Sequence, residues 1–227
     1  MRFNHIFKLT NENETHREYK CDNVNINIDF ISGSALRVAV FNDNAEMLPT
    51  FTVNPNNNLS SLGRSRLSVD GFDCVAPVVE KFENKEKFVL DCGVTVDLDL
   101  NNFILSYSKE SKLLFADRAP LAYNFEGEFG NGSYHYITRE DDEHIFGLGD
   151  KSGLINKAGQ VYRVETADSM GFDAEKTDPL YKHVPFYICE NSVGAYGIYY
   201  DTTDTSFVDL GREINNYYCH FKYFKTD

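Results

Sequence analysis

The chain has 227 residues, of which 42% are hydrophobic, and its 22 Lys and Arg stand against 35 Asp and Glu for a formal net charge of −13. This is the composition of a folded globular protein, and its negative charge repels polyanions, so we expect no nucleic-acid partner. No apolar run approaches the roughly 18 residues of a membrane-spanning helix, and the N-terminal end holds no apolar signal core. We therefore expect no membrane partner and a cytoplasmic location.

The first strand signals along the chain form two hairpins. Residues 24–30 alternate apolar side chains with Asn and Asp, which is typical of a half-buried strand whose polar face meets solvent. Residues 36–41 follow a Ser-Gly-Ser turn and predict the partner strand. Residues 94–100 alternate in the same way, and an Asn-Asn pair breaks the pattern before residues 103–107. This second pattern is the clearest hairpin in the sequence.

Other short segments also have strand composition: 88–90, 113–116, 134–138, 196–200, 205–210 and 217–223. Several short strands separated by turn signals indicate a β-sandwich or a barrel. Residues 54–63 and 127–133 are dense in Asn, Gly and Ser and predict exposed loops. No linker or repeat divides the chain, so we predict a single all-β domain over residues 1–227.

Residues 144–188 have few helix signals and are rich in Gly, Asp and aromatic residues. Connections longer than about 12 to 15 residues are uncommon in compact domains and usually functional. Within this segment GLGDKSG matches neither phosphate-binding motif, so its glycines indicate a turn that leaves a strand. We predict a long functional loop.

The acidic residues of this segment are candidates for chemistry: Asp150, Glu165, Asp168, Asp173, Glu175 and Asp178. A retaining glycosidase needs two carboxyl groups about 5 to 5.5 Å apart, one of them with a raised pKa. Spacing in the sequence leaves open whether these acids form such a pair or are solvated turn residues.

The five cysteines and six histidines are scattered, without C-x-x-C, H-x-H or H-E-x-x-H spacing. We therefore predict that the protein binds no metal ion, and that the cysteines are buried thiols in a reducing compartment. No cofactor motif is present, so we expect no cofactor.

Residues 146–188 carry three linked motifs: an FGLG-[DE]-K-x-G start, a T-[AD]-D-x-x-G-[FY]-D centre and a DPLYK-x-x-PF-[YF] close. In order and spacing they resemble the N-terminal domain of glycoside hydrolase family 31, the α-glucosidase and α-xylosidase family. A weaker likeness extends back over residues 114–118 and forward through 194–201, and about the first 90 residues are covered only loosely. The resemblance implies a galactose-mutarotase-like β-sandwich, in agreement with the strand pattern.

The resemblance also implies where the chemistry lies. In the family this domain precedes a (β/α)8 barrel that carries both catalytic aspartates, so we expect no catalytic residue in this chain and no activity of the segment alone. The expected partners are an α-linked oligosaccharide and the chain's own C-terminal catalytic barrel.

A loop at about 149–183 is expected to narrow the substrate pocket. The resemblance makes Asp168 a hydrogen-bond acceptor for sugar hydroxyls and Phe172 a wall of the pocket, whereas Met170 stands where many relatives have an aromatic residue. The alternative that Asp168 only caps its own turn stays open.

The leading hypothesis is therefore the N-terminal domain of a retaining α-glucosidase. An alternative is a stand-alone carbohydrate-binding β-sandwich, although the chain has no Trp to stack on sugars. A mutarotase is a third hypothesis and rests on fold analogy alone. In the family a further strand follows residues 217–224, and its absence would leave a sheet edge open, so we also expect association into a homo-oligomer.

Overall fold

The computed structural model describes residues 5–55, 62–123, 132–213 and 218–224. All of the strand pairs in these residues are antiparallel, which confirms the predicted all-β class. The chain divides into two compact units, Met1–Ser111 and Lys112–Asp227, each of which is described by itself. The single domain over 1–227 stays a prediction. Most of the two predicted exposed loops, 56–61 and 127–131, lies outside the described residues.

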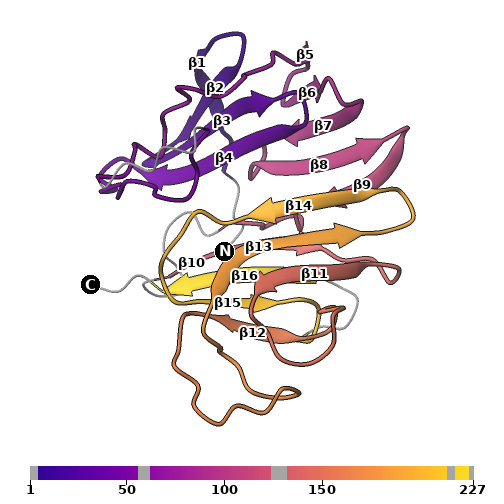
Figure 1. Cartoon of the computed structure of the whole chain (residues 1–227). Helices are drawn as coiled ribbons and strands as arrows, with labels where there is room; N and C mark the ends of the chain where they lie inside the picture. Colours follow the sequence, from indigo (N-terminus) through magenta and orange to yellow (C-terminus); the bar gives the residue numbers. More distant parts are fainter. Residues whose placement is uncertain (1–4, 56–61, 124–131, 214–217, 225–227) are drawn as a thin grey trace. The chain divides into compact units, whose positions relative to one another are not determined.

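The first unit contains two groups of hydrogen-bonded strands (Figure 1). One group has the order β1-β2-β3-β4, with β1 (Lys8–Glu12), β2 (His16–Cys21), β3 (Val24–Ser32) and β4 (Ala35–Asn42). The other has the order β5-β6-β7-β8, with β5 (Val78–Lys81), β6 (Lys85–Val89), β7 (Val94–Asp99) and β8 (Ile104–Lys109). Both predicted hairpins are confirmed, as β3–β4 and β7–β8.

The prediction that the polar face of β3 meets solvent is wrong. Asp29 is buried between Ile28 and Phe30, with 2% of its surface exposed. Its carboxylate accepts hydrogen bonds from Arg37 Nη2 at 2.7 Å and Arg37 Nε at 2.9 Å, and lies 2.6 Å from His16 Nδ1. These cationic and polar partners replace water as hydrogen-bond partners of the Asp29 carboxylate. The alternating sequence pattern therefore belongs to a strand that is buried on both faces.

The second unit begins with β9 (Lys112–Ala116) and contains two sheets. The first has the order β10-β16-β15-β12, with β10 (Gly132–Thr138), β16 (Tyr218–Phe224), β15 (Ser206–Asp209) and β12 (Val161–Val164). The second has the order β11-β13-β14, with β11 (His144–Gly149), β13 (His183–Glu190) and β14 (Ala195–Tyr199).

The two sheets of this unit bury one shared core, which makes the unit a sandwich (Figure 1). Ile137, Tyr162 and Val208 come from the first sheet, and Ile145 and Tyr187 come from the second. β16 lies between β10 and β15, so the strand expected beside an open edge is an interior strand. Association into a homo-oligomer stays a prediction.

The prediction that residues 144–188 are one loop is wrong, because the segment contains β11, β12 and most of β13. In β13, Tyr187 and Cys189 point into the core while Val184, Phe186 and Ile188 are exposed. Apolar residues on both faces hide the alternation by which a strand is recognised. The connection at 149–183 does run from the end of β11 to the start of β13, with β12 in its middle.

Of the four cysteines whose side chains the structure describes, one fulfils the expectation of a buried thiol. Cys189 is buried, and burial raises the pKa of its thiol to about 12. Cys21 and Cys74 are half-buried and Cys92 is exposed, and none of these four forms a disulfide. Across the described ranges, no helix has both the length and the apolar character needed to cross a bilayer.

Candidate functional site

The connection between β11 and β13 is held to the sandwich by a buried ion pair. Lys151 Nζ lies 2.9 Å from Asp178 Oδ1, and the lysine side chain is only 1% exposed. The same ammonium donates to the carbonyl oxygen of Arg163 in β12, and the other oxygen of Asp178 accepts from the Arg163 backbone N–H. Both ends of the connection are thereby joined to β12.

Lys157 adds a second buried ammonium beneath the connection. Its Nζ donates to the Ser152 carbonyl oxygen at 3.2 Å and lies 5.4 Å from the centre of the Tyr162 ring. Burial lowers the pKa of Lys157, and the positive charge of Lys151 lowers it further. The base of the connection is therefore packed and charged in a fixed arrangement.

Beyond β12 the chain forms a protrusion over residues 166–181, whose two limbs are hydrogen-bonded to each other. Ala167 N donates to Leu180 O at 3.1 Å, Ser169 Oγ donates to Pro179 O at 2.7 Å, and Tyr181 OH donates to Ser169 O at 3.2 Å. Leu180 is 8% exposed and anchors the returning limb. The protrusion is thus ordered by its own contacts.

A separate turn closes the far end of the protrusion. Asp173 Oδ1 accepts from the backbone N–H of Glu175 at 2.8 Å, and Thr177 Oγ1 accepts from the backbone N–H of Asp173 at 2.8 Å. These are the side-chain-to-backbone bonds that Asp and Thr commonly form in turns. Asp173 is therefore a turn residue.

The exposed side of the protrusion carries the predicted site residues. Asp168 is exposed, and within the described residues its carboxylate forms no hydrogen bond, so the turn-capping alternative has no contact to support it. Phe172 is 52% exposed and Met170 is 87% exposed. An exposed carboxylate can accept hydrogen bonds from sugar hydroxyls, and exposed apolar side chains can cover the C–H face of a sugar ring. Asp168 and Phe172 remain predicted substrate contacts.

The six acids of the segment differ in their surroundings. Glu165 lies 2.9 Å from Arg163, Asp173 closes its turn, and Asp178 pairs with Lys151. Three of the six candidates therefore have structural partners, which weakens the hypothesis that the segment holds a self-contained catalytic pair. The sequence analysis did not identify Lys151 as a residue that anchors the connection. Its place in the first family motif and that of Asp178 in the third were the signal for an ion pair between them.

A further polar cluster of the second unit surrounds His135. The Nε2 atom of its ring lies 2.8 Å from Asp117 Oδ1, and Nδ1 lies 2.9 Å from the Tyr200 hydroxyl. The Tyr123 ring stacks on the imidazole with the ring centres 4.5 Å apart. Both ring nitrogens therefore have polar partners within this unit, and the mutarotase hypothesis still rests on fold analogy alone.

Known proteins share the fold of this chain. A dextranase of glycosyl hydrolase family 31 from Flavobacterium johnsoniae, complexed with isomaltotriose, matches 99% of this chain with a TM-score of 0.72 at 20% identity. The cycloalternan-forming enzyme from Listeria monocytogenes, in complex with a pentasaccharide substrate, matches 98% with a TM-score of 0.72 at 14% identity. Alpha-glucosidase 2 from Bacillus thermoamyloliquefaciens is 25% identical over 112 residues, which are 49% of this chain.

The chain corresponds to only part of each of these proteins: 27% of the dextranase, 19% of the cycloalternan-forming enzyme and 14% of the α-glucosidase. The family described as the glycosyl hydrolase 31 N-terminal galactose mutarotase-like domain matches residues 25–209. This match confirms the family and the fold type that the sequence motifs predict. Since it covers most of the 227 residues, the chain belongs to the family of glycosyl hydrolase 31 N-terminal galactose mutarotase-like domains.

Proposed function

We propose that this chain is the N-terminal domain of a retaining α-glucosidase, in which residues 149–183 form part of the substrate pocket and the domain packs on the catalytic barrel. Membership of the family supports the assignment, as does the small share of each relative that the chain covers. The full-length enzyme hydrolyses α-glucosidic bonds through two carboxyl groups of the barrel. This segment supplies substrate contacts and no catalytic residue.

One observation carries the proposal. Asp168 is the acid of the central family motif, and it is exposed on a protrusion whose other contacts are already formed. A carboxylate that accepts from two sugar hydroxyls forms charge-assisted bonds, which are about twice as strong as neutral ones. The buried Lys151–Asp178 pair fixes the base of the protrusion, so little conformational freedom is lost when a sugar binds.

The test is the variant Asp168→Ala in the full-length enzyme, assayed on maltose and isomaltose. We expect kcat/KM to fall roughly 10- to 150-fold, because a charged hydrogen-bond acceptor is lost. This corresponds to about 1.5 to 3 kcal/mol of lost transition-state stabilisation. Glu175→Ala is the matched control, since Glu175 is an exposed acid of the same protrusion whose side chain forms no hydrogen bond within the described residues. Unchanged kinetics for Asp168→Ala would remove Asp168 from the pocket.

The 227-residue chain alone separates this proposal from the stand-alone module. We expect no release of 4-nitrophenol from the α-glucoside above the buffer rate, and no binding of maltose or isomaltose at millimolar concentration. Binding in that range by the isolated chain would favour the carbohydrate-binding module. Light scattering across a wide concentration range tests the homo-oligomer, and cell fractionation tests the cytoplasmic location.

A further inference from the structure

The N-terminal segment and strand β2 of the first unit meet at the ring of Phe103. Phe7 is 1% exposed, and its ring centre lies 5.5 Å from that of Phe103. Tyr19 in β2 is 1% exposed, and its ring centre also lies 5.5 Å from that of Phe103. In extended chains residues two apart share a face, so His5 lies on the Phe7 side of its segment and Cys21 on the Tyr19 side of β2.

Backbone bonds fix the position of His5. The His5 N–H donates to Asn102 Oδ1 at 2.9 Å, and the Asn102 backbone N–H donates to the His5 carbonyl oxygen at 2.7 Å. The neighbouring Ile6 forms a bridge with Asn101. The imidazole is therefore attached to a segment that is paired with the β7–β8 turn.

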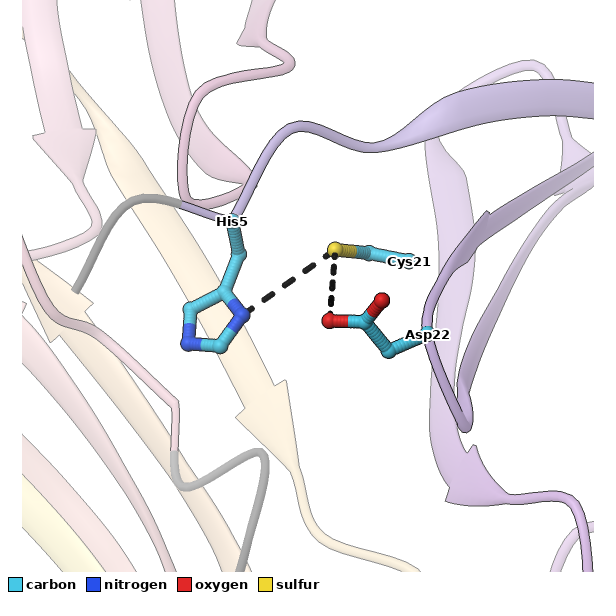
Figure 2. Close-up of side chains that lie close together, drawn as sticks. All are labelled: His5, Cys21 and Asp22. Atoms are coloured by element: carbon cyan, nitrogen blue, oxygen red, sulfur yellow. Dashed lines mark hydrogen bonds between the residues drawn. The ribbon is translucent and has the colours of Figure 1, made fainter.

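Cys21 and Asp22 approach the imidazole from the hairpin between β2 and β3. Cys21 pairs with Val24 at the end of this hairpin, and Asp22 begins the turn with a φ of 52°. The left-handed conformation is one that Asp tolerates in tight turns. It brings the Asp22 carboxylate to the Cys21 sulfur, as Figure 2 shows.

The three side chains converge on one point. Cys21 Sγ lies 4.0 Å from His5 Nδ1 and 3.9 Å from Asp22 Oδ2, and the three atoms all lie within 4.8 Å of one another (Figure 2). Tetrahedral zinc with bonds of about 2.0 to 2.3 Å places its ligand atoms roughly 3.3 to 3.6 Å apart. The two pairs that include sulfur, at 4.0 and 3.9 Å, are thus a few tenths of an ångström longer than this ligand spacing.

We propose that His5, Cys21 and Asp22 bind one Zn²⁺ ion through Nδ1, Sγ and Oδ2, with water as the fourth ligand. Thiolate and imidazole ligands favour zinc over the hard cations Ca²⁺ and Mg²⁺, which prefer oxygen. As the S–Zn bond forms, the thiol proton leaves to solvent. The ion joins the N-terminal segment to the β2–β3 hairpin, and the site does not depend on the proposed glycosidase function.

Cobalt substitution tests the site, because a thiolate ligand gives Co²⁺ a charge-transfer band that oxygen and nitrogen ligands do not give. The reduced, metal-free 227-residue chain is titrated with Co²⁺ and then with Zn²⁺. We expect one equivalent of Co²⁺ to produce the thiolate band and one equivalent of Zn²⁺ to abolish it. A chain with an unchanged circular-dichroism spectrum and no thiolate band would overturn the proposal.

Variants identify the ligands. In competition with a chromophoric chelator, Cys21→Ser and His5→Gln are expected to raise the Kd for Zn²⁺ at least tenfold, and Cys21→Ser also removes the cobalt thiolate band. Cys92→Ser is the matched control, because Cys92 is an exposed cysteine outside the cluster. A band that persists in Cys21→Ser, or that disappears in Cys92→Ser, places the metal elsewhere.

A measurement on the unmodified chain avoids any effect of the variants on folding. Zn²⁺ is expected to slow alkylation of Cys21 at least tenfold, as followed by peptide mass spectrometry, and to leave alkylation of Cys92 unchanged. Equal rates for Cys21 with and without Zn²⁺ would contradict binding at this cluster.

Discussion

The Lys151–Asp178 pair offers the sharpest test of how the predicted pocket segment is held. The substitution Lys151→Met keeps an unbranched chain of similar length in a site where the lysine is 1% exposed, and it removes the positive charge. Asp178 then keeps its bond from the Arg163 backbone N–H but loses its ion-pair partner. We expect the second unit to lose stability and the protrusion at 166–181 to open more often.

The size of the effect follows from the burial of the pair. Removing one partner of a fully buried ion pair costs about 3 to 5 kcal/mol. Asp178 is 18% exposed, and loss of the Lys151 charge also relieves the electrostatic repulsion that lowers the pKa of Lys157. Both facts reduce the cost, so we expect a loss of about 2 to 3 kcal/mol in the free energy of unfolding.

The assay is a double-mutant cycle of Lys151→Met and Asp178→Asn, followed by urea unfolding. Amide hydrogen exchange at residues 165–180 then assigns the effect to the protrusion. Lys176→Met is the control, because Lys176 is an exposed lysine of the same protrusion, and it should change stability by less than about 0.5 kcal/mol. A coupling energy below about 0.5 kcal/mol, or exchange that is unchanged at 165–180, would refute the role assigned to the pair.

Three further variants test other parts of the fold. Burial alone lowers the pKa of His16, but hydrogen bonds to two carboxylates outweigh it and raise the pKa above 6.5. Protonated His16 therefore stabilises the folded state fully below pH 6.5, and this stabilisation is lost as the pH rises through the folded-state pKa. The Tm difference between the unmodified chain and His16→Gln should shrink as the pH rises above about 6.5, and a difference that grows would contradict the raised pKa. Gly147→Ala should lower the free energy of unfolding in urea by at least about 2 kcal/mol, because φ is 127° and an added Cβ would lie 2.6 Å from Phe186 O. Gly171→Ala is the control and should cost about 1 kcal/mol, because an added Cβ there meets open space. Equal costs would contradict the close approach at Gly147. Phe103→Ala, which empties a 0% exposed site, should cost about 3 to 5 kcal/mol by the same assay, and a cost below about 1 kcal/mol would contradict its central position.

The sequence predicts best those strands whose neighbours follow directly in the chain. The β3–β4 and β7–β8 hairpins combine alternation with turn residues, and both signals are local. β1, β2 and β5 lack apolar alternation; their burial patterns are mostly exposed or mixed, so only pairing with neighbours identifies them. The β11 strand is hidden for a different reason, since Gly147 and Gly149 read as a turn but stand at a register shift within the pairing to β13.

The proposed metal cluster lies beyond sequence reasoning for the same physical cause. Metal motifs are recognised when their ligands follow one another at a fixed spacing on one element. His5 and Cys21 are 16 positions apart and meet only because Phe7 and Tyr19 pack on the same ring. Packing in the core brings the two residues together, and a short sequence motif cannot predict such packing.

The acids of the pocket segment show how structure ranks candidates that the sequence leaves equal. A carboxylate that already neutralises a buried ammonium or caps a turn cannot also bind a sugar without giving up that contact. Asp178 and Asp173 are committed in this way, and Glu165 is paired with Arg163. Asp168 has no such contact within the described residues, so a sugar hydroxyl would displace only water from it. The carboxylates of Asp150 and Glu175 are likewise exposed and form no hydrogen bond within the described residues, so the contacts leave three candidates and only the family motif selects Asp168 among them. The charge that fixes the segment comes from Lys151.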